Sequence, residues 1–136
     1  MGIDKPVLGG DGLDSPVLGE LAGKTALNKV YFSNHYSSLD KDPLIVKFME
    51  EFKNKNSKDP NAFSALGYDL GYFAADAIKR ANSTDPAKIK EALDNTTEFK
   101  GVTGTFSIDK NHNPVKTAVV IELKDGVQYS SVKVEP

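Results

Sequence analysis

The period of the apolar residues changes once along the chain, and this change most constrains what the chain can fold into. Between residues 43 and 95 apolar side chains recur every three or four positions, as on one face of an α-helix. Beyond Phe99 they alternate with polar residues, as in a strand with one exposed face, on Val102, Gly104, Phe106 and Ile108. Helical and alternating segments in one short chain predict an α/β fold.

Capping residues followed by proline predict where three helices begin. Ser15-Pro16, Asp42-Pro43 and Asp85-Pro86 each offer a side-chain acceptor and then a proline, which is harmless at the first helical position. We expect the first of these helices to stop at Gly23 and the second near Lys55. A fourth helix, which lies between the last two of these in the sequence, is expected to begin after Asp59-Pro60 and to end near Arg80. Its apolar stripe consists of Phe63, Leu66, Leu70, Phe73, Ala77 and Ile78.

Short apolar runs predict the strands. Val7-Leu8 and Val30 to Ser33 precede the long helices, and Ala118 to Leu123 is a continuous apolar run. The Asp125-Gly126 pair predicts a two-residue hairpin turn into a last strand. In that strand the alternation of apolar and polar residues shifts by one position, which predicts a bulge near Ser130-Ser131. The fold class is therefore α/β, a layered sheet with flanking helices in the order β-α-β-α-α-α-β-β-β.

Composition narrows the function. The 136 residues carry a formal net charge of -2, and their Lys and Arg are scattered among acids, so nucleic-acid binding is not expected. The chain has no cysteine and two histidines, which excludes thiol catalysis and disulfides and leaves no metal-ligand spacing. We expect no cofactor, no metal and no enzyme activity.

The most informative candidate site is the loop Gly9-Gly10-Asp11-Gly12 at the carboxyl end of the first strand. Open α/β sheets bind ligands beyond this end of their strands, and the glycines allow a ligand to approach the backbone. Asp11 is expected to hold an ammonium group by a charge-assisted hydrogen bond, with Gly12 beside it. The alternative is that Asp11 only terminates a turn, since Gly and Asp are common turn residues.

Aromatic side chains of the fourth helix are candidates for the walls of an apolar pocket. Phe63 and Tyr68 are the expected contacts, with Tyr72 one turn further on, and the alternative for each is core packing. Gly67 and Gly71 lie inside this helix, where a close approach of another backbone or a ligand is the expected reason for them. His35 is interpreted as a surface histidine.

Five segments together resemble the branched-chain amino-acid-binding proteins of bacterial ABC transporters, which have the type I periplasmic-binding fold. The resemblance covers nearly the whole chain. It rests on Pro6-Val7-Leu8-Gly9-Gly10-Asp11-Gly12, Val30-Tyr31-Phe32, Phe63-Ser64-Ala65-Leu66-Gly67-Tyr68-Asp69, Ala75-Asp76-Ala77-Ile78-Lys79-Arg80-Ala81 and Phe99-Lys100-Gly101-Val102-Thr103-Gly104.

The resemblance implies a Venus-flytrap protein whose two lobes close on a free, branched-chain or related amino acid. Asp11 matches the acidic position that takes the ligand ammonium, Phe63 matches an aromatic pocket position, and Tyr68 matches the motif. Residues 34–41 match a crossover between lobes. The chain corresponds to the carboxyl-terminal portion, with 1–33 and 102–136 mainly in one lobe and 43–95 mainly in the other, and the amino-terminal lobe that holds the ligand carboxylate is not in it.

The resemblance also implies a partner and a place. The partner is a membrane permease of the ABC type, and the place is periplasmic or extracellular, where a membrane-associated lipoprotein is one option for the intact protein. Because the helical stripes lack an amino-terminal lobe to cover them, we expect the chain by itself to form a homodimer. Two alternatives stay open: a structural or assembly module without a ligand, and a small α/β enzyme that uses Asp11 and His35.

Overall fold

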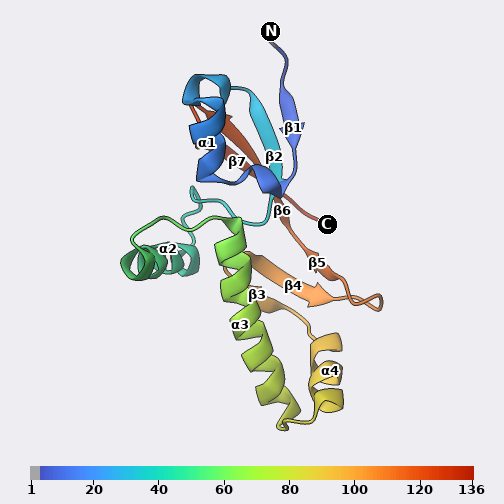
Figure 1. Ribbon diagram of the computed structural model, residues 1–136. Coiled ribbons are helices and arrows are strands. Elements are labelled where there is room, and N and C mark those ends of the chain that lie inside the picture. The colour runs from blue at the N-terminus through green and yellow to red at the C-terminus, as the bar shows by residue number, and fades with distance from the viewer. Residues whose placement is uncertain (1–3) are drawn as a thin grey trace.

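The structure is a computed structural model that describes residues 4–136. The chain forms two units, one above the other in Figure 1, each with its own sheet. In chain order the elements are β1 (Val7–Gly9), a 3₁₀ turn (Asp11–Leu13), α1 (Pro16–Ala22), a second 3₁₀ turn (Lys24–Ala26), β2 (Val30–Asn34), α2 (Pro43–Asn56), α3 (Ala62–Ala81), α4 (Pro86–Asp94), β3 (Phe99–Gly101), β4 (Gly104–Ile108), β5 (Pro114–Lys116), β6 (Ala118–Lys124) and β7 (Val127–Val134).

Local capping chemistry starts the helices, as the sequence predicts. The side chains of Ser15, Asp42 and Asp85 accept hydrogen bonds from the backbone two residues on, and a proline follows each of them at the start of α1, α2 and α4. The longest helix, α3, is capped by Asn61 instead: its side chain accepts from the Ser64 N–H while the Ser64 hydroxyl accepts from the Asn61 N–H. These reciprocal bonds satisfy backbone groups that a helix end leaves free.

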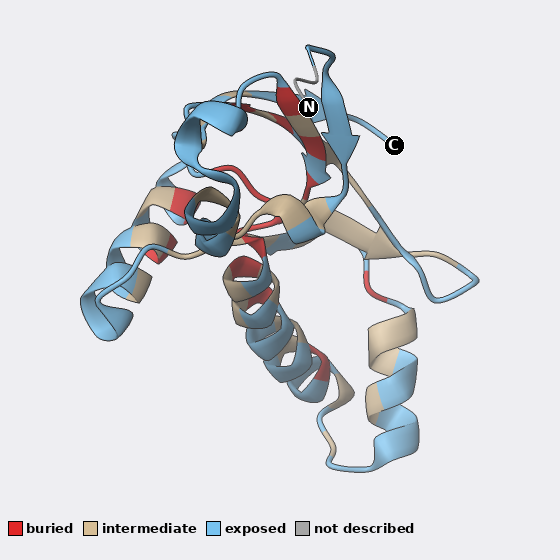
Figure 2. Ribbon diagram, turned by 45° about the horizontal axis from the view of Figure 1, so that its top comes forward, coloured by how far each residue is buried: buried red, intermediate tan, exposed pale blue. Residues whose placement is uncertain are grey.

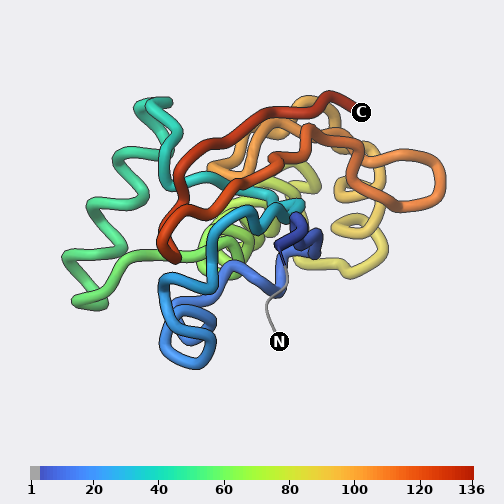
Figure 3. Tube along the Cα trace, turned by 90° about the horizontal axis from the view of Figure 1, so that it is seen from above, coloured from blue at the N-terminus to red at the C-terminus, as the bar shows by residue number. Residues whose placement is uncertain are grey.

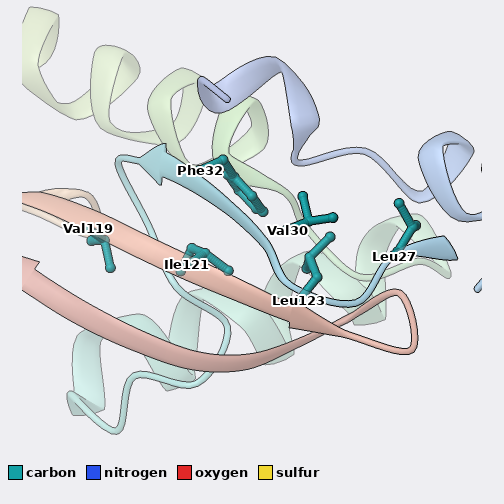
Figure 4. Close-up of a cluster of buried hydrophobic side chains, with 6 residues drawn as sticks. All are labelled: Leu27, Val30, Phe32, Val119, Ile121 and Leu123. Carbon is teal, nitrogen blue, oxygen red and sulfur yellow. The ribbon is translucent and has the colours of Figure 1, made fainter. Parts of the chain in front are cut away.

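The first unit is a four-stranded sheet of order β1-β2-β6-β7 with α1 beside it. β1 and β2 are parallel, with Gly9 opposite Phe32, and the other pairs are antiparallel. One face of β2 and β6 supplies a hydrophobic core, drawn in Figure 4, that consists of Leu27, Val30, Phe32, Val119, Ile121 and Leu123. Side chains alternate across a strand, which is why every second residue of these strands is buried.

The hairpin between β6 and β7 forms as predicted. Lys124 pairs with Val127, and Asp125 and Gly126 have positive φ angles of 50° and 77°, which a two-residue turn of this kind requires. The bulge in β7 is present but lies at Tyr129, because Glu122 pairs with Ser130 whereas the next residue of β6 pairs with Gln128. It therefore falls one residue before the expected position.

The second unit packs three helices around a small antiparallel sheet of order β3-β4-β5. Seen from above, α2 and α4 lie on opposite sides of the molecule (Figure 3). Phe48 of α2 is the centre of one core, with its ring 6.0 Å from that of Tyr36 and 4.9 Å from that of Tyr68. A second aromatic cluster joins α3 to the sheet through Phe73, Phe99 and Phe106.

The expected order of elements missed two strands and one division. β3 and β5 are three residues long, too short for a period to be read from sequence, so five strands follow α4 and not three. The expectation also grouped 102–136 with 1–33; only 118–134 pair with the first strands, whereas 99–116 form the second sheet beside α3. Residues 1–3 of that expected grouping lie outside the described residues. That the two units belong to different lobes of a longer protein is a proposal.

The face that α3 buries agrees only in part with the predicted one: Ala77 is buried and Phe73 packs against the second sheet, but other members of the stripe are exposed. Its buried positions are Ala62, Ala65, Asp69 and Ala77, a narrow stripe in Figure 2, whereas Phe63 and Leu70 of the predicted stripe are 55% and 65% exposed. Small residues permit close packing on this side, and the larger apolar side chains remain outside. Gly67 and Gly71 are also not explained by a close approach, because a Cβ at either position meets nothing within 4 Å.

Candidate functional site

Asp11 and His35 meet at the carboxyl edge of the first sheet. Because β1 and β2 are parallel neighbours, the residues that follow them emerge at the same edge. Asp11 lies in the 3₁₀ turn after β1, His35 directly follows β2, and His35 Nε2 is 3.5 Å from Asp11 Oδ2. Both side chains are about two-fifths exposed, at 39% and 43%. The edge therefore presents a carboxylate that a small cationic group can reach.

The glycines before Asp11 shape this turn. A Cβ at Gly9 would clash with the end of the Leu13 side chain, so glycine lets Leu13 pack against the backbone there without shifting. Around Gly10 and Gly12, by contrast, a Cβ would meet nothing within 4 Å. Space beside Asp11 is thus open on the side of Gly12, which is exposed.

Asp14 brings the Asp11 segment to the start of α3. Its Oδ2 accepts a hydrogen bond of 2.7 Å from the Ala62 N–H, and its carbonyl oxygen accepts one of 3.5 Å from Asn61 Nδ2. Phe63, the next residue of α3, is exposed at this end of the helix. The predicted site residues Asp11 and Phe63 are therefore brought to the same region from positions 52 residues apart in the sequence.

Tyr68 lies elsewhere in the structure. Its ring packs between those of Phe48 and Tyr72, at centroid distances of 4.9 and 4.8 Å, on the side of α3 that faces α2. The neighbouring Tyr72 hydroxyl, together with burial, raises the pKa of Tyr68 to about 12, so its hydroxyl stays neutral at physiological pH. In this structure Tyr68 is a wall of the α2–α3 core, which was the alternative for it.

Two buried polar groups lie directly behind the sheet edge. Among residues 4–136, the Asn34 Nδ2 and the Tyr36 hydroxyl are buried side-chain groups without a hydrogen-bond partner. Burial, and then the charges of Asp14 and Asp59, raises the pKa of Tyr36. The sequence gives no signal for either residue, because both lie in a polar stretch that predicts only a connecting loop.

A cavity of about 470 Å³ lies between the two units on the side of the crossover segment. It is bounded by that segment, by the β3–β4 turn and by β7, and an ion pair of 2.8 Å joins Asp40 to Lys133 there. Within residues 4–136 no group of three or more His, Cys, Asp or Glu side chains is arranged to hold a metal ion. None of the helices in the described part of the chain has the length and apolar character that crossing a membrane requires.

A mixed sheet and a small antiparallel sheet, joined by a crossover segment, with an accessible carboxylate after the first parallel strand, are the features of the fold that the comparisons with known proteins identify. Residues 1–128 match the sequence profile of the periplasmic binding proteins, and the chain belongs to this family. The solved structures agree. The branched-chain amino acid transporter substrate-binding protein LivJ from Streptococcus pneumoniae, in complex with isoleucine, is 33% identical over 100% of this chain and 39% of its own, with a TM-score of 0.90.

Two further structures show the range of ligands. The leucine-binding protein LivK from Thermotoga maritima is 38% identical over 99% of this chain and 39% of its own, with a TM-score of 0.88. A solute-binding protein from R. palustris in complex with benzoate is 26% identical over 96% of this chain and 35% of its own, with a TM-score of 0.75. The chain thus spans about 39% of the length of LivJ and LivK. The family places it outside the cytoplasm, among transport binding proteins.

Proposed function

We propose that this chain is part of the substrate-binding component of an ABC transporter for branched-chain or related amino acids. The observation that carries the proposal is the Asp11 carboxylate at the sheet edge, reachable by solvent and three residues before Asp14, which is hydrogen-bonded to the start of α3. An α-ammonium group needs such an acceptor, because a charge-assisted hydrogen bond stabilises it when water is excluded. LivJ and LivK, which resemble the chain over its whole length, support a branched-chain ligand.

Asp11, Gly12 and Phe63 are the residues we assign to the ligand. Asp11 accepts from the ammonium, Gly12 leaves room for the α-carbon, and the exposed Phe63 ring offers an apolar surface for the side chain. Tyr68 acts on the ligand only through the packing of α3. The ligand carboxylate is bound by residues of the intact protein that lie outside this chain, and the complete protein delivers the amino acid to a membrane permease, with a lipoprotein anchor as one means of staying near it.

Benzoate, the ligand of the R. palustris relative, makes the test sharp, because it has a carboxylate and an apolar ring but no ammonium. Nuclear magnetic resonance titration of the 136-residue chain with leucine, isoleucine and benzoate measures where each binds. We expect weak binding of leucine and isoleucine, with a Kd no tighter than about 1 mM, since half of the site is absent and only about -4 kcal/mol remains at that affinity. Shifts should centre on Asp11, Gly12 and Phe63.

Equal shifts with benzoate would show that the ammonium is not what the site recognises, and the amino-acid assignment would have to be given up. A micromolar Kd for leucine would overturn the division of the site between two lobes. For an Asp11→Asn variant in the same titration, Asp85→Asn is the matched control, because it changes a helix-capping carboxylate far along the chain from Asp11.

A second proposal concerns the chain by itself, which we expect to form a homodimer. The outer face of α3 exposes Phe63, Leu70 and Ile78, and large exposed apolar patches are typical of interaction surfaces. A second copy can cover this face, with or without exchange of elements about residues 34–41. The apolar side chains Ile45 and Phe48 of α2 need no second copy to cover them, because they are buried within the chain. Light scattering at micromolar concentration that gives a stable monomer mass would exclude the dimer.

A further inference from the structure

Asp14 is the residue whose side chain faces both units. One carboxylate oxygen, Oδ2, accepts the 2.7 Å hydrogen bond from the Ala62 N–H of α3. The other, Oδ1, is 3.4 Å from Gln128 Nε2 on β7, its donor in the first unit. The sequence separations are 48 and 114 residues, so neither contact follows from local structure.

The hydrogen bond from the Ala62 N–H to Asp14 is charge-assisted, because its acceptor is a carboxylate. The Ala62 N–H belongs to the first turn of α3, where backbone donors have no partner inside the helix. Asn61 already caps the helix through the Ser64 N–H, so Asp14 satisfies a different free donor. The positive end of the helix dipole also favours a carboxylate at this place.

The crossover segment, in contrast, is attached to the first unit. Gln128 Oε1 accepts from the backbone and hydroxyl of Ser38 and from the hydroxyl of Ser37, at 3.1 to 3.2 Å. Asp40 pairs with Lys133 of β7 at 2.8 Å. Tyr36 of the same segment packs against Phe48 of the second unit, so the segment contacts both units. The bond from Asp14 to Ala62 is different, because it joins the loop after β1 directly to the start of α3.

We propose that Asp14 is a positioning residue for the ligand site, which favours the closed arrangement of the two units before any ligand binds. Its bond to Ala62 holds the edge that carries Asp11 against the end of α3 that carries Phe63. A contact made only in the closed state raises the population of that state, and a ligand that needs both sides then binds with a higher apparent affinity. As a statement about ligand affinity, this inference rests on the proposed function.

The arrangement of the units can be measured without a ligand. Because the chain has no cysteine, Glu20→Cys on α1 and Lys79→Cys on α3 accept two spin labels at exposed positions, and double electron–electron resonance gives the distance distribution between them. We expect Asp14→Ala to shift this distribution to longer distances or to broaden it. Asp14→Asn keeps an oxygen acceptor and should restore most of the parent distribution.

The matched control is Asp85→Ala. Asp85 accepts a 2.9 Å hydrogen bond from the Ala87 N–H at the start of α4, so its loss removes a helix-end bond of the same kind within the second unit. This variant should leave the distance distribution of the parent unchanged. Asp14→Ser, which is smaller and uncharged but polar, serves as the second variant if Asp14→Ala fails to give the circular dichroism spectrum of the folded chain.

A distribution for Asp14→Ala or Asp14→Ser that superimposes on that of the parent overturns the proposal, as does an equal broadening in Asp85→Ala. In leucine titrations we expect Asp14→Ala to bind about three- to tenfold more weakly than the parent, which is the net contribution of one hydrogen bond. If a two-lobed protein that carries this chain binds no amino acid, the proposed function fails, while the distance measurement still decides the role of Asp14.

Discussion

The carboxylate of Asp69 accepts a hydrogen bond of 2.6 Å from the hydroxyl of Thr103, 34 residues further along the chain. The backbone N–H groups of Val102 and Thr103 donate to the two oxygens of the same carboxylate, each at 2.8 Å. Lys116 donates to the Thr103 hydroxyl at 2.7 Å, and burial lowers the pKa of Lys116. One buried acid of α3 thus holds the turn between β3 and β4 against the helix.

Asp69→Ala is expected to destabilise the fold by about 3 kcal/mol or more, because two backbone donors and a hydroxyl lose their acceptor in a buried place. Gly101→Ala is expected to cost about 1–3 kcal/mol, since its Cβ would clash with the Asp69 carboxylate. Urea unfolding measures both. In the double variant the clash is absent, so its loss of unfolding free energy should be smaller than the sum of the losses in the two single variants. Full additivity would show that the Asp69 carboxylate is not what excludes a side chain at position 101.

Phe48 and Phe63 offer a comparison of the same residue type in two environments. Phe48 is 1% exposed and packs against three aromatic rings, so Phe48→Ala should lower the free energy of unfolding by about 3–5 kcal/mol. Phe63→Ala should change it by less than about 1 kcal/mol, because the ring is largely outside the core. Thermal or urea unfolding of the two variants checks this. Similar losses in both would mean that Phe63 is buried in solution, as in a dimer.

Asp11→Asn is expected to weaken amino-acid binding by about 2 kcal/mol or more in a two-lobed protein that carries this chain, because the enclosed ammonium loses its counter-charge. Calorimetric titration with leucine measures the difference. The chain fused behind the amino-terminal lobe of the Streptococcus pneumoniae relative is one such protein, with the unaltered relative as the positive control. His35→Gln is the neighbouring control, which leaves the Asp11 carboxylate in place. An unchanged Kd in Asp11→Asn would remove Asp11 from the site.

Acid pH should weaken the tie between the crossover segment and β7. The Lys133 ammonium beside Asp40 holds the pKa of that carboxyl below its ordinary value of 3.8. A carboxyl with a lowered folded-state pKa adds stability above the unfolded value, and this contribution is lost as the pH falls through the folded value. The free energy of unfolding of the parent should therefore exceed that of Asp40→Asn by about 1 kcal/mol or less at neutral pH, since Lys133 is mostly exposed. This difference should disappear below about pH 4.

Urea midpoints of the two proteins between pH 7 and pH 3 measure this gap. Lys133→Met is the partner control, in which Asp40→Asn should have a smaller effect at neutral pH. A gap that grows as the pH falls would have the wrong sign for a lowered carboxyl pKa and would contradict the ion pair.

The sequence by itself determined the parts of the molecule that depend on a few neighbouring residues. Ser15-Pro16, Asp42-Pro43 and Asp85-Pro86 start three helices because a side-chain acceptor two residues away satisfies a free N–H. Asp125-Gly126 makes the last hairpin because its turn needs two positive φ angles. The free energies of these helix starts and of this turn depend on neighbouring residues, so a pattern of a few residues predicts them. The five segments that carry the family resemblance likewise led to the family that the comparisons show.

Only the tertiary structure decided what distant residues do to one another. The apolar stripe of α3 predicted a core face on Phe63 and Leu70, but the helix buries Ala65 and Asp69, because the β3–β4 turn offers donors that a carboxylate can satisfy. Likewise, the bond from Asp14 to Ala62 depends on where α3 lies, and Asp14 is not among the residues that the sequence patterns single out. A periodicity reports which side chains share a face and not which partner covers them, so contacts across 30 to 114 residues depend on the packing of the whole chain.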